Sequence, residues 1–396
     1  MPMPKSSRRK DSKGRVLKTG ESERKGSYVG YQYRFTDSIT QKRVTVYAKT
    51  LNELREKEKE IASLKTLGVS YLSGSISFLS IVEQYIETKR NRSYNTIQNY
   101  KYAVKNIADS PIASLAVRDL KRSHLKNWYL KLQENGAGSG KIRMIHTVVR
   151  GACQAAMDDL LIPYNPALFS LSFLKNTAKH KPAMLPEQQK HFLEFLYTSK
   201  RWKKRAFIVE LLLCTGMRIS ELCGLRFKDV DFKSQKLSIN HQLLRERSGR
   251  FYISPPKTNA GSRIIPMSDK LCAHFQEFIQ SPDYLKTDMI VDGYSGFIFA
   301  IKTNKPLYQI YAGIEFSRMV NDYNSNYPSN PLPPNFSLHS LRHTFITNIV
   351  NGGVSIKSAQ YLAGHSDAQM TLNVYADANA QQACDELSSL HQKLLD

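Results

Sequence analysis

Six residues in the C-terminal half of the chain have side chains that suit the chemistry of a phosphodiester. Transfer of a phosphodiester needs an oxygen nucleophile in line with the leaving oxygen, cations on the non-bridging oxygens and a proton donor for the leaving group. Tyrosine, arginine, lysine and histidine side chains can meet these needs. The candidates are Arg218, Lys257, His339, Arg342, His365 and Tyr375.

Arg218 lies in CTGMRISELCGL, directly after a glycine turn and at the expected start of a helix. There a guanidinium and the first backbone N–H groups of the helix can point at one anion. The alternative is that Arg218 only pairs with Glu221, three residues further along the helix.

His339 and Arg342 lie in SLHSLRHTFIT, three residues apart. This spacing projects both side chains from one face of a helical turn, where they could contact a single phosphate. The alternative is an amphipathic helix with an exposed histidine and arginine. The neighbouring His343 is expected to face elsewhere and to be structural.

Lys257 lies in SPPKTNAGSRIIPM, at the end of an expected strand and before an Asn-Ala-Gly turn. At the tip of a hairpin, this lysine could reach into a minor groove and protonate a departing 5′-hydroxyl. As an isolated residue it would be a solvated surface charge.

His365 follows a glycine helix stop in YLAGHSDAQMTLNVYADAN, and Tyr375 comes ten residues later. Ten residues of straight helix would separate them by about 15 Å, so the chain must bend near Ser366 and Asp367, which also suit N-cap positions. The chain has 21 tyrosines, so residue type alone does not single out Tyr375. A free tyrosine has a pKa of about 10 and needs cations or a base to act as a nucleophile.

The order and spacing of these residues form one pattern. From Leu185 to about Ala378 the chain resembles the tyrosine recombinase, or lambda-type integrase, family, and in particular the integrases of conjugative transposons and temperate phages. The segments that carry the resemblance are TGMRISEL, PKTNAGSRIIP, HSLR, LAGH and VYA. The one visible departure is LAGH, where the family usually has LGH.

The resemblance implies a role for each candidate. Arg218 and Arg342 would hold the non-bridging oxygens, Tyr375 would attack and leave a 3′-phosphotyrosine, and Lys257 would protonate the 5′-hydroxyl. His339 would assist proton transfer, and His365 would donate a hydrogen bond to a phosphate oxygen. Because the covalent bond retains the phosphoester energy, no cofactor and no metal is expected. The sequence has neither a GxxxxGK loop nor a ligand cluster with metal spacing.

The resemblance also implies the partners. They are double-stranded DNA at attachment sites and a homotetramer on that DNA, which would integrate and excise a mobile element. An excisionase and a host DNA-bending protein are further partners that it suggests. Three alternatives stay open: a type IB topoisomerase-like enzyme, a non-catalytic DNA-binding protein, and an RNA-binding protein, although no aromatic RNA-binding signature is visible.

Composition agrees with a polyanionic partner. The chain of 396 residues has 57 Lys+Arg against 34 Asp+Glu, a formal net charge of +23. A basic surface gives affinity for phosphates without sequence specificity. Five widely spread cysteines, no apolar run of membrane length and no signal peptide indicate reduced thiols in a cytosolic protein. The resemblance implies that this is the bacterial cytoplasm, at the nucleoid.

The expected fold class is mainly α with small β elements (α+β), in three domains. Residues 1–70 would form a basic arm, disordered over 1–26 until it meets phosphate, then a hairpin from 27–35 and 42–48 and a helix that Thr50 and Glu53 begin as a capping box. Residues 75–175 would form a core-binding bundle of four helices, and a linker would follow over 174–183. Residues 180–396 would form the catalytic domain.

The catalytic domain is expected to mix helices with three strands. A buried helix ends at Gly216, strands fall in KLSINHQ, RFYISPP and RIIPM, and later helices begin near Ser337, Ser355 and Asp367. After Tyr375, a tail helix has Leu387, Leu390 and Leu394 on one face. By the family resemblance, the tail would dock on a neighbouring protomer.

Overall fold

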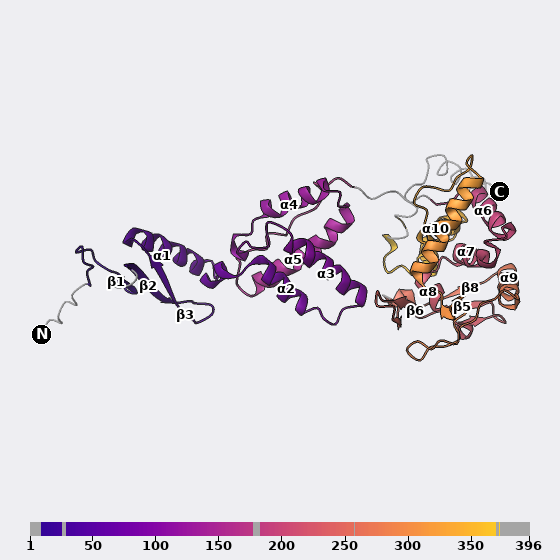
Figure 1. The fold of residues 1–396 in the computed structure, drawn as a ribbon, viewed down its shortest axis with the longest axis horizontal. Coiled ribbons are helices and arrows are strands. Elements are labelled where there is room, and N and C mark those ends of the chain that lie inside the picture. The colour runs from indigo at the N-terminus through magenta and orange to yellow at the C-terminus, as the bar shows by residue number, and fades with distance from the viewer. Residues whose placement is uncertain (1–8, 26–28, 177–182, 257, 370–371, 373–396) are drawn as a thin grey trace, which may run out of the picture. The chain divides into compact units, whose positions relative to one another are not determined.

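The structure, a computed structural model, describes residues 9–25, 29–176, 183–256, 258–369 and 372. The chain divides into two compact units, residues 1–179 and 180–396 (Figure 1). Helices predominate and the sheets are small, so the expected α+β class is confirmed. In the described part, no helix has the length and apolar character needed to span a membrane.

The first unit begins with a three-stranded antiparallel sheet, with β2 in the middle, and one helix (Figure 1). Phe35 of β2 lies opposite Val44 of β3, so the predicted hairpin is confirmed. The predicted capping box is also present: the backbone N of Glu53 donates to Oγ1 of Thr50 (3.2 Å), and the backbone N of Thr50 donates to Oε2 of Glu53 (3.4 Å). The elements are β1 (Glu21–Arg24), β2 (Gly30–Thr36), β3 (Arg43–Ala48) and α1 (Leu51–Thr66).

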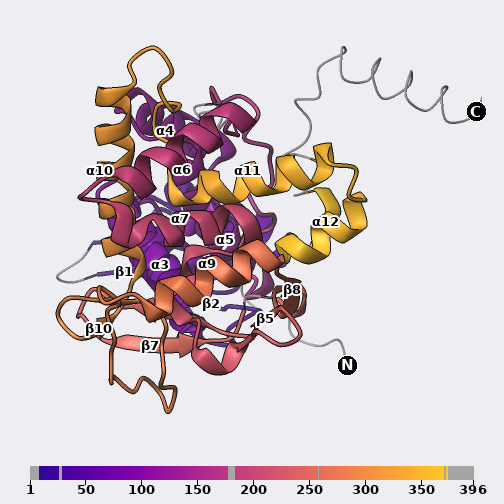
Figure 2. The ribbon, with the colours of Figure 1, turned by 90° about the vertical axis from the view of Figure 1, so that its right-hand side faces the viewer.

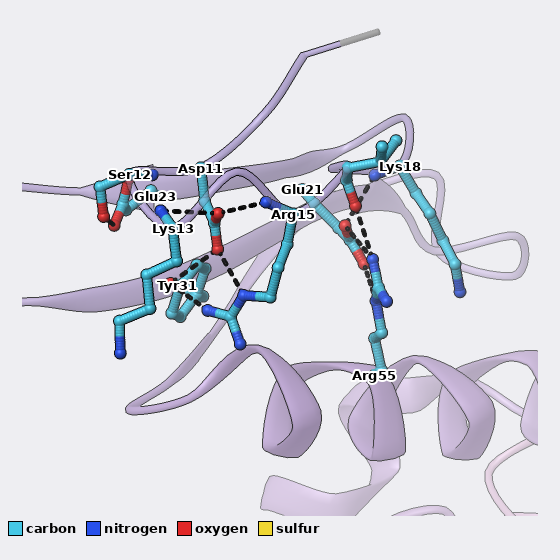
Figure 3. Close-up of polar contacts among 10 residues, drawn as sticks. Asp11, Ser12, Lys13, Arg15, Lys18, Glu21, Glu23, Tyr31 and Arg55 are labelled. Atoms are coloured by element: carbon cyan, nitrogen blue, oxygen red, sulfur yellow. Dashed lines mark hydrogen bonds and ion pairs between the residues drawn. The ribbon is translucent and has the colours of Figure 1, made fainter.

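The expectation of a disordered arm is wrong for residues 9–25. Oδ1 of Asp11 accepts hydrogen bonds from the backbone N of Lys13 (3.0 Å) and of Arg15 (2.8 Å), and its Oδ2 accepts from Nε of Arg15 (2.8 Å) (Figure 3). Glu21 is fully buried and accepts a hydrogen bond from Nε of Arg55 on α1 (3.1 Å). A few carboxylates therefore bind this basic segment to the sheet and the helix.

Four helices follow in the same unit and confirm the predicted bundle. Helix α5 packs against the other three and buries a continuous apolar face that includes Ile142, Ile145 and Val149. The helices are α2 (Phe78–Glu87), α3 (Tyr94–Ala108), α4 (Arg122–Glu134) and α5 (Ser139–Asp158), with short 3-10 helices η1 (Tyr71–Ser75) and η2 (Val117–Asp119).

Asp37 connects the sheet to the chain that enters this bundle. It is buried in the turn between β2 and β3, where Oδ1 accepts from the backbone N of Thr40 (2.8 Å). Its Oδ2 accepts from Oγ of Ser70 (3.1 Å) and from the backbone N of Tyr71 (2.8 Å). One carboxylate thus satisfies donors from two segments more than thirty residues apart.

The second unit has one large core, to which Phe207, Phe275 and Phe316 contribute from three different helices. Helix α7 packs against α11, and α11 against α12 (Figure 2). The helices are α6 (Pro186–Thr198), α7 (Lys203–Thr215), α8 (Ile219–Gly224), α9 (Asp269–Gln280), α10 (Gln309–Asn326), α11 (Leu338–Asn351) and α12 (Ile356–Ala363).

Within its described residues, the strands of the second unit form three small sheets. Strand β8 pairs with β5, and β7 pairs with β6. The expectation of a hairpin with Lys257 at its tip is therefore wrong, because the two strands that flank residue 257 belong to different sheets. The elements are β4 (Val230–Asp231), β5 (Lys236–Ile239), β6 (Gln242–Arg245), β7 (Phe251–Ser254), β8 (Arg263–Pro266), β9 (Ala300–Ile301) and β10 (Lys305–Pro306), with η3 (Phe227–Asp229) and η4 (Asn259–Gly261).

Candidate active site

Arg218 occupies the position that the sequence predicts, as the N-cap of α8 after the left-handed Gly216. The predicted pairing with Glu221 is also present: Nη1 of Arg218 donates to Oε1 (2.8 Å), and its backbone N donates to Oε2 (2.8 Å). Nη2 of Arg218 donates to the carbonyl of Gly364 (3.0 Å). Its side chain stays 35% exposed, so a guanidinium already held by two hydrogen bonds still faces solvent.

Arg342 is buried in the first turns of α11, whose N-cap is Ser337 as predicted. Its Nη1 donates to the carbonyl of Gly216 (2.8 Å), and its Nη2 donates to the carbonyl of Ala363. Burial, followed by the nearby positive charge of Arg218, lowers the pKa of Arg342 to about 9. The side chain therefore still carries its charge at neutral pH.

His365 follows Gly364, which ends α12 in the left-handed conformation. It is 6% exposed. Burial and the charges of Arg342 and Arg218 lower its pKa to about 4. The imidazole is therefore neutral at physiological pH, and it can donate a hydrogen bond without adding a charge.

His339 is exposed on the first turn of α11, one turn before His343. The expectation that His343 faces elsewhere is wrong, because its ring lies edge-on against the ring of His339 with 4.8 Å between the centroids. Both imidazoles are near enough to His365 to contribute to the lowering of its pKa. His339 and His343 of α11 therefore both lie near His365.

The C-terminal end of α12 joins these residues. The last carbonyls of a helix have no partner within the helix. Here three successive carbonyls, those of Leu362, Ala363 and Gly364, each accept a hydrogen bond from a different arginine. The arginines are Arg263, Arg342 and Arg218.

Arg263 is a member of this cluster that the sequence did not reveal. It begins β8, and its side chain is fully buried. Nη2 donates to Oε2 of Glu221 (2.8 Å), and Nε donates to the carbonyl of Leu362 (2.7 Å). Its only signal in the sequence is its position two residues before Ile265, which places both side chains on the same, inward face of a short strand.

The cluster carries an excess of positive charge. The guanidiniums of Arg218 and Arg263 contact the carboxylate of Glu221, and that of Arg342 lies within its electrostatic reach, which leaves a formal charge of +2 (three minus one). An excess of this size suits a phosphodiester, because cations placed in advance stabilise the charge that develops in the transition state.

Of the six candidates, the structure brings Arg218, Arg342 and His365 together and places His339 on the same helix as Arg342. Lys257 and Tyr375 lie outside the described residues. The predicted bend before the tyrosine is present in part: the backbone N of Gln369 donates to Oδ1 of Asp367 (2.9 Å), and the backbone is helical at residues 368 and 369. The tail residues 387, 390 and 394 also lie outside the described part.

Among the described residues, no group of three or more histidine, cysteine, aspartate or glutamate side chains could hold a metal ion. Four cysteines are described, and all four are free thiols; Cys153, Cys223 and Cys272 are buried, and Cys214 is exposed.

Two family models match the sequence. Residues 182–382 match the phage integrase family, and residues 5–64 match the DNA-binding domain of the Tn916 integrase. The first match spans the whole arginine cluster. The second spans the three-stranded sheet and most of α1.

Two transposases are similar to this chain over almost its full length. The transposase from transposon Tn916 of Enterococcus faecalis is 31% identical over 402 residues, which cover 98% of this chain and 98% of that protein. The transposase from transposon Tn1545 of Streptococcus pneumoniae has the same identity and coverage.

Solved structures are similar as well. The Tn1549 transposon integrase, residues 82–397, in complex with a circular intermediate DNA, has 32% identity and a TM-score of 0.75, and the match covers 79% of this chain and 99% of that one. A lambda integrase tetramer bound to a Holliday junction has 18% identity and a TM-score of 0.51, covering 89% of this chain and 97% of that one, which shows a common fold.

Proposed function

The chain belongs to the phage integrase family, and from this premise we propose how its residues carry out the reaction. It is a DNA strand-cleaving and rejoining enzyme, a site-specific tyrosine recombinase of a mobile element.

Arg218 and Arg342 bind the non-bridging oxygens of the scissile phosphate. The observation that carries this assignment is their convergence, with His365, at the C-terminal end of α12. Each guanidinium has five N–H groups and donates two of them from its side chain to protein acceptors, so donors remain for phosphate oxygens. Their charges oppose the negative charge that accumulates in the pentacoordinate transition state.

His365 donates a hydrogen bond to a phosphate oxygen as a neutral imidazole, which its low pKa favours. The exposed His339 assists proton transfer. Tyr375 is the nucleophile, and its attack leaves a 3′-phosphotyrosine while Lys257 gives a proton to the departing 5′-hydroxyl. These last two roles rest on sequence position, since both residues lie outside the described part.

The DNA substrate is the set of attachment sites at the ends of the mobile element. The Tn1549 integrase, which is similar over 79% of this chain, has been solved with a circular intermediate DNA, and we propose the same class of substrate here. We assign one function to each of three domains. Residues 1–70 bind arm-type DNA, residues 75–175 bind the core site, and residues 180–396 cleave and rejoin the strands. The match of residues 5–64 to a DNA-binding domain supports the first assignment.

The active assembly is a homotetramer on DNA in the bacterial cytoplasm, at the nucleoid, with an excisionase and a host DNA-bending protein as accessory partners. The tail beyond Ala380 links the subunits. A chain that ends at Ala380 should bind DNA as the full chain does but fail to assemble, which light scattering on DNA measures. Unchanged assembly of the shortened chain would refute the role of the tail.

The experiment that tests the reaction is incubation with a nicked duplex that carries one end of the element, followed by a denaturing gel. We expect a covalent protein–DNA band that is lost in Tyr375→Phe and kept in Tyr327→Phe, the matched change at an exposed tyrosine of the same unit. A band that survives in Tyr375→Phe contradicts the assignment of the nucleophile. Strand exchange between two sites then separates a recombinase from a type IB topoisomerase, which needs no paired sites, and a protein that only binds DNA gives no band.

A further inference from the structure

Arg263 is a fully buried arginine with every nitrogen engaged. Nη1 and Nη2 contact the two carboxylate oxygens of Glu221 at 3.2 Å and 2.8 Å, and Nη1 also donates to the carbonyl of Gly261 (3.0 Å). Nε donates to the carbonyl of Leu362 (2.7 Å). With a side-chain exposure of 0%, this guanidinium cannot itself contact DNA.

The Glu221 carboxylate is shared between two arginines. Oε1 accepts from Nη1 of Arg218 and from Nη1 of Arg263, and Oε2 accepts from the backbone N of Arg218 and from Nη2 of Arg263. Burial opposes ionisation of Glu221, but the hydrogen bonds and charge of Arg263, followed by those of Arg218, hold its pKa below the ordinary value. Arg263 is therefore the stronger partner of this carboxylate.

Arg263 also fixes the end of α12 directly before His365. A Cβ on Gly364 would lie 2.9 Å from Nη1 of Arg263, so the guanidinium packs against the backbone of this glycine. The neighbouring residue on β8 adds a second contact, because the backbone N of Ile264 donates to the hydroxyl of Tyr361 (3.1 Å). Strand β8 and the last turn of α12 thus form one packed piece.

We propose that Arg263 is a positioning residue of the phosphate site: it shares the charge of Glu221 with Arg218 and holds the last turn of α12, so that Arg218 and His365 face the same phosphate. This inference rests on the proposed function, since it assigns those two residues to the scissile phosphate.

Two physical effects follow from removing this guanidinium. Arg218 would then be the one arginine still paired with the negative charge of Glu221, and the formal charge of the cluster would fall from +2 to +1. The carbonyl of Leu362 would lose its donor, and the turn that ends at His365 would be free to shift. A misplacement of about 1 Å can slow an enzyme reaction about 100-fold without abolishing substrate binding.

The first experiment compares cleavage rates of full-length variants on the nicked duplex, at saturating protein. We expect Arg263→Met to form the covalent complex about 100-fold more slowly. Arg226→Met is the matched control, because Arg226 is also mostly buried and paired with a carboxylate, that of Asp229, and it should cleave within about twofold of the wild-type rate. Arg263→Met at the wild-type rate overturns the proposal.

A second change distinguishes charge and positioning from simple support of the fold. The double variant Arg263→Met with Glu221→Gln restores the formal charge to +2 and removes the unshared carboxylate. It should cleave at least about tenfold faster than Arg263→Met alone, as expected for residues that act as a coupled pair. If the double variant is as slow or slower, Arg263 only supports the fold and the proposal is wrong.

If Arg263→Met does not fold, Arg263→Lys takes its place. Lysine keeps the charge but cannot bridge Glu221 and Leu362 with a planar fork. Provided that it melts near the wild-type temperature, Arg263→Lys should cleave about tenfold more slowly. The wild-type rate in this variant also overturns the proposal.

A binding measurement keeps this test separate from the proposed chemistry. In the Tyr375→Phe background, fluorescence anisotropy gives the affinity for a duplex with a normal scissile phosphate and for one with an uncharged methylphosphonate there. The preference for the charged phosphate should fall with Arg263→Met and return in the double variant. An unchanged preference contradicts the role of Arg263, whereas failure of the wild-type chain to form any covalent band contradicts the proposed function.

Discussion

Gly216 lies so close to Phe345 that a Cβ added at position 216 would come within 2.1 Å of Cδ1 of the ring. The backbone at Gly216 is also left-handed, with φ of 59°. The carbonyl of the same glycine accepts the hydrogen bond from Nη1 of Arg342. One glycine therefore ends α7, admits the ring of Phe345 from α11 and holds a candidate catalytic arginine.

Gly216→Ala should lower the free energy of unfolding by about 2–4 kcal/mol, because the left-handed backbone and the contact with Phe345 both resist a methyl group. Urea unfolding at 25 °C measures the change. Gly293→Ala is the control: its φ is 81° but no atom lies within 4 Å of the added Cβ, so only the backbone cost of about 1 kcal/mol applies. Equal losses in the two variants would contradict the role of the close contact.

His365 should make the folded state sensitive to acid. Its pKa is about 4 when folded and about 6.5 when unfolded, so below pH 6.5 the unfolded chain takes up a proton that the folded chain does not. Stability is therefore lost as pH falls from about 6.5 towards 4, by about 2 kcal/mol at pH 5 relative to pH 7. His365→Gln should lack this part of the loss in urea unfolding at the two pH values. An identical pH dependence in both proteins would disprove the assignment.

Asp37→Ala should loosen the first unit where the sheet meets the chain that enters the bundle. The buried carboxylate accepts from the backbone N of Thr40 and of Tyr71, and the change leaves these donors without a partner, at a cost of about 3 kcal/mol. Hydrogen exchange of the two amides should quicken. Ser38→Ala, an exposed change in the same turn, should leave exchange unaltered; a similar effect from both changes would count against Asp37.

Asp11→Asn should release the basic arm. Hydrogen bonds from Arg15 and Tyr31 offset the burial of Asp11 and lower its pKa to about 2, so the carboxylate is charged at any physiological pH. Its loss should make trypsin cut after Arg15 several-fold faster, as local opening becomes more frequent. Mass spectrometry of a short digest detects the product, with Asp109→Asn as the exposed control. No change in the cutting rate would show that Asp11 does not hold the arm.

Local signals predicted much of the candidate site. A glycine before Arg218 fixed a helix end and an N-cap, and the three-residue spacing of His339 and Arg342 fixed their common helix. These features depend on neighbours within one turn, and such neighbours are visible in a sequence. The capping box of Thr50 and Glu53 was predictable for the same reason.

Features that depend on distant partners were not predictable. Arg263 looked like any charge on a strand, because its partners Glu221 and Leu362 are 42 and 99 residues away. The alternation of apolar and polar residues predicts strands but not which strands pair. The pairing of β7 with β6 and of β8 with β5 was therefore not predictable. In the arm, the basic composition obscured the carboxylates of Asp11 and Glu21, each of which is buried by residues from other segments.

The three guanidiniums that meet at the end of α12 can be gathered only late in synthesis, because their shared acceptors lie near the end of the chain. Arg218 reaches its acceptor across 146 residues of sequence, and Arg342 reaches back across 126. A nascent chain that has not yet released residue 364 from the ribosome contains Arg218 and Arg342 but has no helix end to gather them. Such a chain also lacks Tyr375, so the last part of the chain to be made supplies both the acceptors that place the arginines and the proposed nucleophile.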